Sequence, residues 1–155
     1  MVKKVVLVNC DIEDTIKQYF YGKDVEFVSN IENCDLIVYD DYNGNLEDNA
    51  INIHPSLLPS FEGEKALEAA FMSGVKVSGI TIHSKNKIIA QYPVLIGINT
   101  HIDEFKSDIK DVKKRLTPPV IESIIEDKVF DFLDLLKNPC SHSYGNCSSC
   151  RRCNK

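Results

Sequence analysis

Asn52 and His54 are the residues whose types and spacing most clearly suggest chemistry. They lie two positions apart at the end of a short apolar run, and alternate residues of a strand point to the same side of a sheet. An amide N–H stabilises a developing oxyanion, and an imidazole accepts and returns protons near neutral pH. On spacing alone, the alternative is a turn asparagine beside a hydrogen-bonded core histidine.

Short motifs surround this pair and follow one another through residue 97. The first is Asn52-Ile53-His54-Pro55-Ser56-Leu57-Leu58-Pro59. The later ones are Ala-Leu-x-x-Ala from residue 66, Gly-Val-Lys from 74, Thr-Ile-His from 81, Ile-Ile-Ala-Gln from 88 and Pro-Val from 93. In this order, the motifs resemble the folate-dependent formyltransferase family, and in particular its glycinamide ribonucleotide formyltransferase branch.

The resemblance implies an activity and a set of site residues. The activity is transfer of a formyl group from 10-formyltetrahydrofolate to a small-molecule amine acceptor. Asn52 and His54 match the family's catalytic positions, and His83, Ile88 and Ile89 match the region that binds the folate. A second interpretation is a non-catalytic scaffold derived from a formyltransferase.

Three segments depart from the family pattern, and one of them, the connection between Asn30 and Asp35, is only four residues long where the family carries an additional helix and strand. The family carries a catalytic aspartate after Thr-x-His, but residues 84–86 contain no carboxylate. Members that bind a nucleotide have a glycine-rich turn after the first strand, whereas residues 9–14 contain three acids and no glycine. We therefore expect no reaction with the nucleotide substrate, and Asp40, Asp41 and Asp103 are the candidates to replace the missing carboxylate.

Apolar runs predict the framework that positions these residues. Short β-branched runs at 5–9, 25–28, 36–39 and 51–53 are typical of buried strands, and apolar residues at helical spacing between the first two predict a helix. Strands that alternate with helices indicate an α/β fold. The family resemblance implies a shortened three-layer sandwich with a mostly parallel, doubly wound sheet.

The second half of the body is expected to contain a hairpin and four helices. A helix over 64–73 precedes Gly74, and strands over 75–83 and 87–94 are close enough to form a hairpin. Thr100 and Asp103 can cap the next helix, and Thr117-Pro118 resembles the start of another. A final apolar helical stretch covers 129–136.

Four cysteines near the end of the chain predict a metal site. Their spacing, Cys-x6-Cys-x2-Cys-x2-Cys, fits zinc or an iron–sulfur cluster, and His142 is an alternative to the first cysteine as a ligand. Disulfides or free thiols are the other interpretations. The four cysteines are Cys140, Cys147, Cys150 and Cys153.

Length and charge bound the remaining possibilities. The 155 residues fit one domain with an appendage, which we place at 1–137 and 138–155. All 23 acidic residues precede residue 135, so the body is acidic and nucleic-acid binding is not expected, while the basic tail leaves room for a protein partner. The absence of a long apolar run argues against a membrane span and favours a cytoplasmic protein. The sequence leaves the oligomeric state open.

Overall fold

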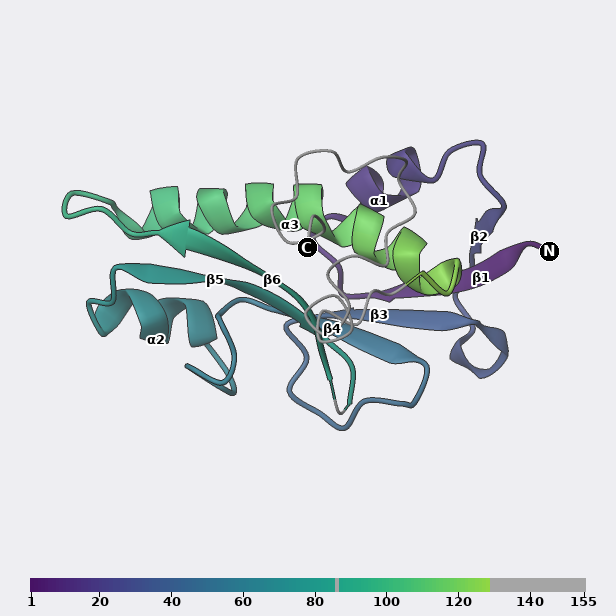
Figure 1. The fold of residues 1–155 in the computed structure, drawn as a ribbon, viewed down its shortest axis with the longest axis horizontal. Coiled ribbons are helices and arrows are strands. Elements are labelled where there is room, and N and C mark those ends of the chain that lie inside the picture. Colours follow the sequence, from purple (N-terminus) through teal and green to yellow (C-terminus); the bar gives the residue numbers. More distant parts are fainter. Residues whose placement is uncertain (86, 129–155) are drawn as a thin grey trace, which may run out of the picture.

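The structure, a computed structural model, describes residues 1–85 and 87–128 (Figure 1). The predicted boundary at residue 137, the apolar stretch 129–136 and the cysteine-rich segment 138–155 lie outside the described residues. Within them the chain folds as an α/β domain around one six-stranded sheet. The strands are β1 (Lys3–Val8), β2 (Val25–Phe27), β3 (Leu36–Asp40), β4 (Ala50–His54), β5 (Val77–His83) and β6 (Ile88–Leu95).

The sheet combines a parallel half with an antiparallel hairpin. Its strand order is β2-β1-β3-β4-β5-β6, in which the first four strands run parallel and β5 and β6 are antiparallel to their neighbours. The Ser84 N–H donates to the Lys87 carbonyl at 2.9 Å and closes the turn between β5 and β6. The mostly parallel sheet and the hairpin predicted from the sequence are therefore confirmed.

Helices α1 (Glu13–Tyr19) and α3 (Ile102–Ile125) lie together on one face of the sheet (Figure 1). Ile16 of α1 and Ile121 of α3 join a cluster of strand residues that includes Val38 and Ile53, all of them almost fully buried. Helix α2 (Ala66–Met72) packs against α3 through a contact between the rings of Phe71 and Phe105. Gly74, at φ 75°, follows its last turn as predicted.

The prediction of two helices over 100–125 was wrong, because α3 is continuous and contains Pro118 and Pro119. Each proline removes an intrahelical N–H bond, but the apolar face continues from Ile109 to Ile121 across them, so packing on the sheet offsets the loss. The predicted Thr100 cap is also wrong, since Thr100 Oγ1 accepts from the Gly97 N–H. Despite the length of α3, no helix in the described part of the chain is apolar enough to cross a membrane.

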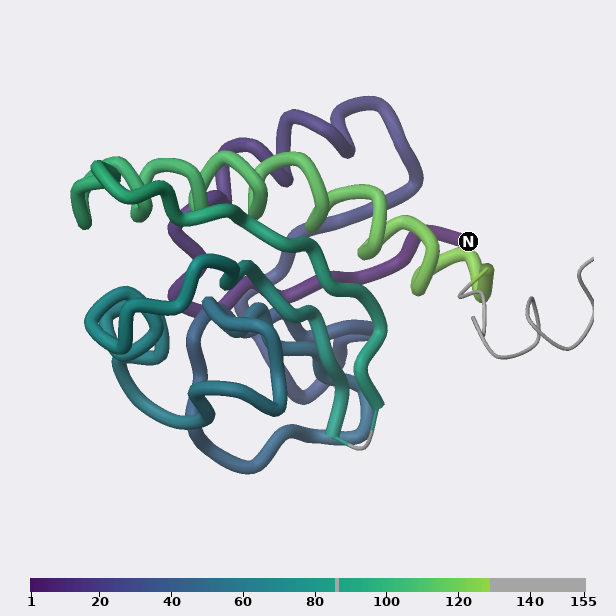
Figure 2. Tube along the Cα trace, turned by 60° about the vertical axis from the view of Figure 1, so that its left-hand side comes forward, coloured from purple at the N-terminus to yellow at the C-terminus, as the bar shows by residue number. Residues whose placement is uncertain are grey.

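The other face of β3 is covered differently. Ile37 and Tyr39 pack there with Leu46, which belongs to the connection between β3 and β4. This face therefore receives a loop where a three-layer sandwich would place a helix, and the three-layer detail is not confirmed. Figure 2 shows the strand β1 beginning next to the end of α3, so the first and last described segments lie side by side.

Gly79 fixes the close approach of β5 and β6. A Cβ atom at this position would fall on the Tyr92 carbonyl oxygen, well inside van der Waals contact. We expect Gly79→Ala to lower the free energy of unfolding by about 1–3 kcal/mol, because the hairpin strands must separate to admit it. Urea denaturation measures the effect. Gly97→Ala is the control, since its nearest neighbour is a side-chain oxygen at 3.1 Å; equal stability of the two variants would contradict the prediction.

Candidate active site

Strand β4 presents Asn52 and His54 on one face of the sheet. The two side chains alternate with Ile53, which points to the α3 face, and both are buried, at 1% and 3% exposure. Across the ladder, Asn52 pairs with His83 and His54 pairs with Thr81 of β5. The rings of His54 and His83 lie 6.5 Å apart between centroids. The sheet therefore brings together the three polar residues that the sequence nominated.

Every hydrogen-bonding group of the Asn52 amide is engaged. Its Oδ1 accepts from the Tyr42 N–H at 3.0 Å, and its Nδ2 donates to the Tyr42 carbonyl at 3.0 Å and approaches His83 Nε2 at 3.3 Å. His83 Nδ1 lies 3.0 Å from the Ser84 carbonyl, which can only accept. A neutral His83 therefore carries its proton on Nδ1, and its Nε2 accepts from Asn52.

The partner of His54 assigns its tautomer in the same way. His54 Nε2 lies 2.9 Å from the Phe61 carbonyl, so this nitrogen donates and Nδ1 keeps a free lone pair in the neutral ring. The loop that supplies Phe61 is itself held on the sheet. Thr81 Oγ1 donates to the Ser56 carbonyl and accepts from the Leu58 N–H, at 2.7 and 3.0 Å. The loop after β4 thus covers the imidazole and fixes its orientation.

A surface cleft of about 410 Å³ lies beside this buried pair. Apolar side chains and charged ones line it together: Leu58, Pro59, Glu62, His83, Ser84, Lys85, Lys87 and Ile88. His83 connects the cleft to Asn52 by the contact described above. Ile89 points to the opposite face of β6, where it packs near α3, because alternate strand residues face opposite sides. The structure therefore brings His83 and Ile88 together, and separates Ile89 from them.

None of the three candidate aspartates is hydrogen-bonded to His54 or His83, so none replaces the missing carboxylate. Asp40 pairs with Ile53 across the ladder and points to the α3 face, and Asp41 and Asp103 are exposed. In the described part of the chain, no carboxylate is hydrogen-bonded to His54 or His83. Glu62 is the carboxylate of the cleft. The sequence motifs did not point to Glu62, although it follows the signature by only three residues.

A second polar cluster lies on the α3 face, where β1 and β3 end. Lys113 Nζ is 2.7 Å from an Asp40 oxygen and 3.1 Å from Asp11 Oδ1, and the Lys113 and Asp40 side chains are only 9% and 4% exposed. Burial alone lowers the pKa of Lys113, but the two carboxylates outweigh it and the pKa is raised. The acidic turn over residues 9–14 thus supplies a carboxylate to a buried lysine.

The titration of Asp40 predicts a pH dependence of stability. Burial raises the pKa of Asp40 from 3.8 to about 6, although Lys113 opposes the shift. Between these values the folded state holds a proton that the unfolded state has lost, so the free energy of unfolding falls as pH rises from about 4 to 6. The lowered pKa of Asp11 acts below this range: burial opposes its ionisation, but bonds to Asp40 and Lys113 outweigh it.

The measurement is chemical denaturation of the wild type and Asp40→Asn across this range. Relative to the variant, the wild type should lose stability from about pH 4 to 6 and change little above it. Asp41→Asn is the control, since Asp41 is exposed and should leave the slope of the wild type unchanged. A constant difference between wild type and Asp40→Asn at all pH values would contradict the assignment.

The two described cysteines are half-buried and free. Burial raises the pKa of the Cys10 thiol to about 11 and raises that of Cys34 as well, which favours the unreactive thiol over the thiolate. Among residues 1–85 and 87–128, no group of three or more histidine, cysteine or acidic side chains is placed to hold a metal ion. The four cysteines predicted to bind metal lie outside the described residues.

Comparison with known proteins agrees with this fold. The profile of the formyl transferase family matches residues 32–125, a stretch that contains β3 to α3 and all three polar residues of the site. The chain therefore belongs to the formyl transferase family.

Two individual relatives are both phosphoribosylglycinamide formyltransferases. Phosphoribosylglycinamide formyltransferase of Bacillus subtilis is 38% identical over 81 residues, which cover 48% of this chain and 42% of that protein. The chloroplastic phosphoribosylglycinamide formyltransferase of Vigna unguiculata is 30% identical over 131 residues, 77% of this chain and 40% of that protein. The chain therefore spans less than half the length of these two relatives.

Solved structures support the fold. The phosphoribosylglycinamide formyltransferase of Anaplasma phagocytophilum superposes with a TM-score of 0.66 at 23% identity, over 82% of this chain and 88% of that one. The glycinamide ribonucleotide transformylase of Geobacillus kaustophilus gives the same TM-score at 19% identity, over 80% and 99%. At this identity the likeness establishes a shared fold.

Proposed function

We propose that this chain transfers a formyl group from 10-formyltetrahydrofolate to a small amine, with Asn52 and His54 as the catalytic residues. The observation that carries the proposal is the shared face of β4, on which an amide donor and an imidazole of assigned tautomer lie two residues apart and next to His83. Family membership over 32–125 supports it.

In the proposed reaction the amine nitrogen attacks the formyl carbon, and the formyl oxygen becomes an oxyanion. Asn52 Nδ2 donates a hydrogen bond to that oxyanion. His54 Nδ1 accepts the proton that leaves the amine and then gives it to the folate nitrogen as the carbon–nitrogen bond to folate breaks. The products are the formylated amine and tetrahydrofolate, and His54 ends in its starting state.

Burial sets a condition on this reaction. Asn52 Nδ2 already has two acceptors, so an oxyanion must replace one of them, and His83 Nε2 is the longer contact at 3.3 Å against 3.0 Å for the Tyr42 carbonyl. His83 also lines the cleft, so a ligand there reaches this contact first. His83 is therefore assigned a supporting role, in which it holds the amide until the substrate takes its place.

The cleft suits the folate chemically. Ile88, Leu58 and Pro59 offer an apolar wall to its aromatic body, and Lys85 and Lys87 supply positive charge near its carboxylate tail. Glu62 lies in the same cleft and is its carboxylate. Ile89 takes no part, because it lies on the other face of β6.

The acceptor is proposed to lack a phosphate. The relatives described above are phosphoribosylglycinamide formyltransferases, but the turn over 9–14 contains no glycine, so it lacks the open backbone N–H groups that hold a phosphate in such a turn. Tetrahydrofolate production can be measured with glycinamide and with phosphoribosylglycinamide as acceptors. We expect glycinamide to react at least as fast, and a clear preference for the phosphorylated amine would contradict this choice of acceptor.

A non-catalytic scaffold is the second candidate function. The burial of Asn52 and His54 and the complete set of protein partners around Asn52 favour it. In this case the function belongs to the segment 138–155, with a zinc ion or an iron–sulfur cluster bound by Cys140, Cys147, Cys150 and Cys153 and a protein partner recruited there. Metal analysis of the full chain and of a chain without 138–155 tests it, and equal metal content would exclude this site.

A further inference from the structure

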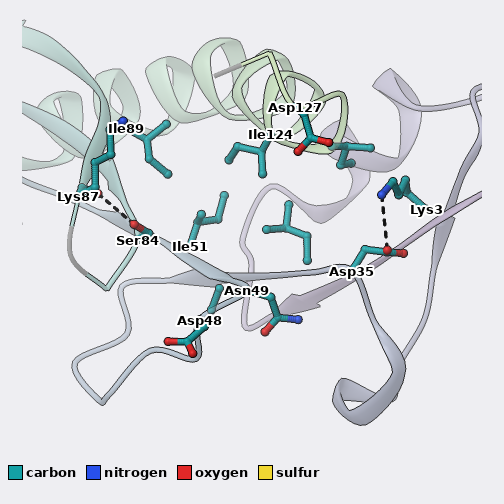
Figure 3. Close-up of a pocket in the computed structure, with 13 residues that line it drawn as sticks. Lys3, Asp35, Asp48, Asn49, Ile51, Ser84, Lys87, Ile89, Ile124 and Asp127 are labelled. Atoms are coloured by element: carbon teal, nitrogen blue, oxygen red, sulfur yellow. Dashed lines mark hydrogen bonds and ion pairs between the residues drawn. The ribbon is translucent and has the colours of Figure 1, made fainter. Parts of the chain in front are cut away.

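A groove of about 330 Å³ lies where the end of α3 meets the edge of the sheet (Figure 3). Ile51 and Ile89 from the strands and Ile124 and Ile125 from α3 form its apolar part. Three of these four isoleucines, all except Ile51, are only partly buried, although they pack against the main core. The groove is thus an extension of the core that the described residues leave uncovered.

The end of α3 lies at this groove. The Lys128 N–H donates to the Ser123 carbonyl at 2.8 Å and the Asp127 N–H donates to the Ile124 carbonyl at 3.1 Å, with Asp127 at φ 52°. These two bonds and the left-handed residue define a Schellman motif, which ends a helix and reverses the chain. Asp127 lines the groove (Figure 3), and the segment 129–136 follows Asp127 in the sequence after one further residue, Lys128.

We propose that residues 129–136 of this same chain dock in the groove. Their sequence is Val-Phe-Asp-Phe-Leu-Asp-Leu-Leu, in which six of eight side chains are large and apolar. Burying such side chains against the partly exposed isoleucines removes apolar surface from water on both sides, at roughly 25 cal/mol per Å². The segment begins directly after Lys128, so its covalent attachment gives it a higher effective concentration at the groove than a separate partner would have.

Docking would connect the end of the chain to the candidate active site. Ser84 and Lys87, in the turn between β5 and β6, line both this groove and the cleft beside His83. A segment seated in the groove therefore supports one side of the turn whose other side faces the cleft. The proposal itself rests on the groove and the helix end, and it holds whether or not the protein transfers formyl groups.

Tryptophan fluorescence tests the docking in the full chain, because the sequence contains no tryptophan. Phe130→Trp and Phe132→Trp each place a single probe in the segment, and Tyr21→Trp provides a reference at a side chain that is 90% exposed. We expect at least one segment probe to emit at shorter wavelength than the reference and to resist quenching by acrylamide. Adding Ile89→Asp should move that emission toward the reference.

Two further variants make the result decisive. Ile124→Asp repeats the groove substitution from α3, and circular dichroism verifies that each variant is folded. Ile98→Asp is the matched control, because Ile98 is 92% exposed and does not line the groove. The proposal is overturned if both probes emit like the reference, or if a blue-shifted emission is unchanged by both groove variants. It is also overturned if the blue shift disappears on dilution, because a second copy of the chain would then fill the groove.

Discussion

Replacing His54 with alanine is expected to lower the rate of formyl transfer by roughly 10²–10⁴-fold, the usual contribution of a positioned acid–base group. Asn52→Ala should lower it by roughly 10²–10³-fold through loss of the oxyanion donor. Both losses should fall on kcat more than on KM, because in the proposed reaction these residues contact the reacting atoms while the cleft provides the folate-binding surface. Steady-state kinetics with 10-formyltetrahydrofolate and the preferred amine measure them.

A matched histidine provides the control for this prediction. His101 is exposed at the start of α3, and its side chain makes no capping bond, so His101→Ala should keep the wild-type rate. Chemical denaturation must confirm that the Asn52 and His54 variants are folded at the assay temperature, since both side chains are buried. Turnover that persists undiminished in folded His54→Ala would place the chemistry elsewhere.

Replacing Lys113 with methionine is expected to lower the free energy of unfolding by about 3–5 kcal/mol. The substitution keeps most of the side-chain volume but leaves the buried carboxylate of Asp40 without its cation. Breaking one side of a buried ion pair costs more than removing both partners, so Lys113→Met with Asp40→Asn should recover a large part of the loss. Urea denaturation at neutral pH compares both variants with the wild type.

The adjacent lysine is the natural comparison. Lys114 is 42% exposed at its side chain, and its ion pair with Asp111 is long at 3.8 Å. Lys114→Met should therefore change the free energy of unfolding by no more than about 0.5 kcal/mol. If Lys113→Met proves as stable as Lys114→Met, the cluster with Asp40 and Asp11 contributes nothing to the fold.

The sequence predicted the elements of the site better than their faces. The apolar runs located β3 and β4, and the family resemblance joined Asn52 to His83, which lies 31 residues away and pairs with it across the ladder. The sequence did not reveal that Asp40 points to the opposite face of the sheet from Asn52 and His83. Strand β3 is apolar from Leu36 to Tyr39 and buried on both faces, so its pattern carries no signal for the direction of Asp40.

Tertiary packing also overrode the local sequence signals for helix ends. Thr117-Pro118 resembles a helix start, yet α3 runs through it because the apolar face on either side remains packed on the sheet. The partner of His54 is a backbone carbonyl at Phe61, and no side-chain pattern predicts such a contact. Glu62 lines the cleft because of the path of the loop after β4, and the sequence motif does not predict that path.

Calorimetric titration of 10-formyltetrahydrofolate into the full chain tests whether the cleft beside His83 binds a folate. We expect saturable binding in the micromolar range that Ile88→Asp weakens at least tenfold, because Ile88 lines this cleft. Ile98→Asp, an equally drastic change at an exposed site outside the cleft, should leave the affinity unchanged. Absence of binding at millimolar folate, or binding that ignores Ile88→Asp, would contradict a folate-dependent transfer at this site.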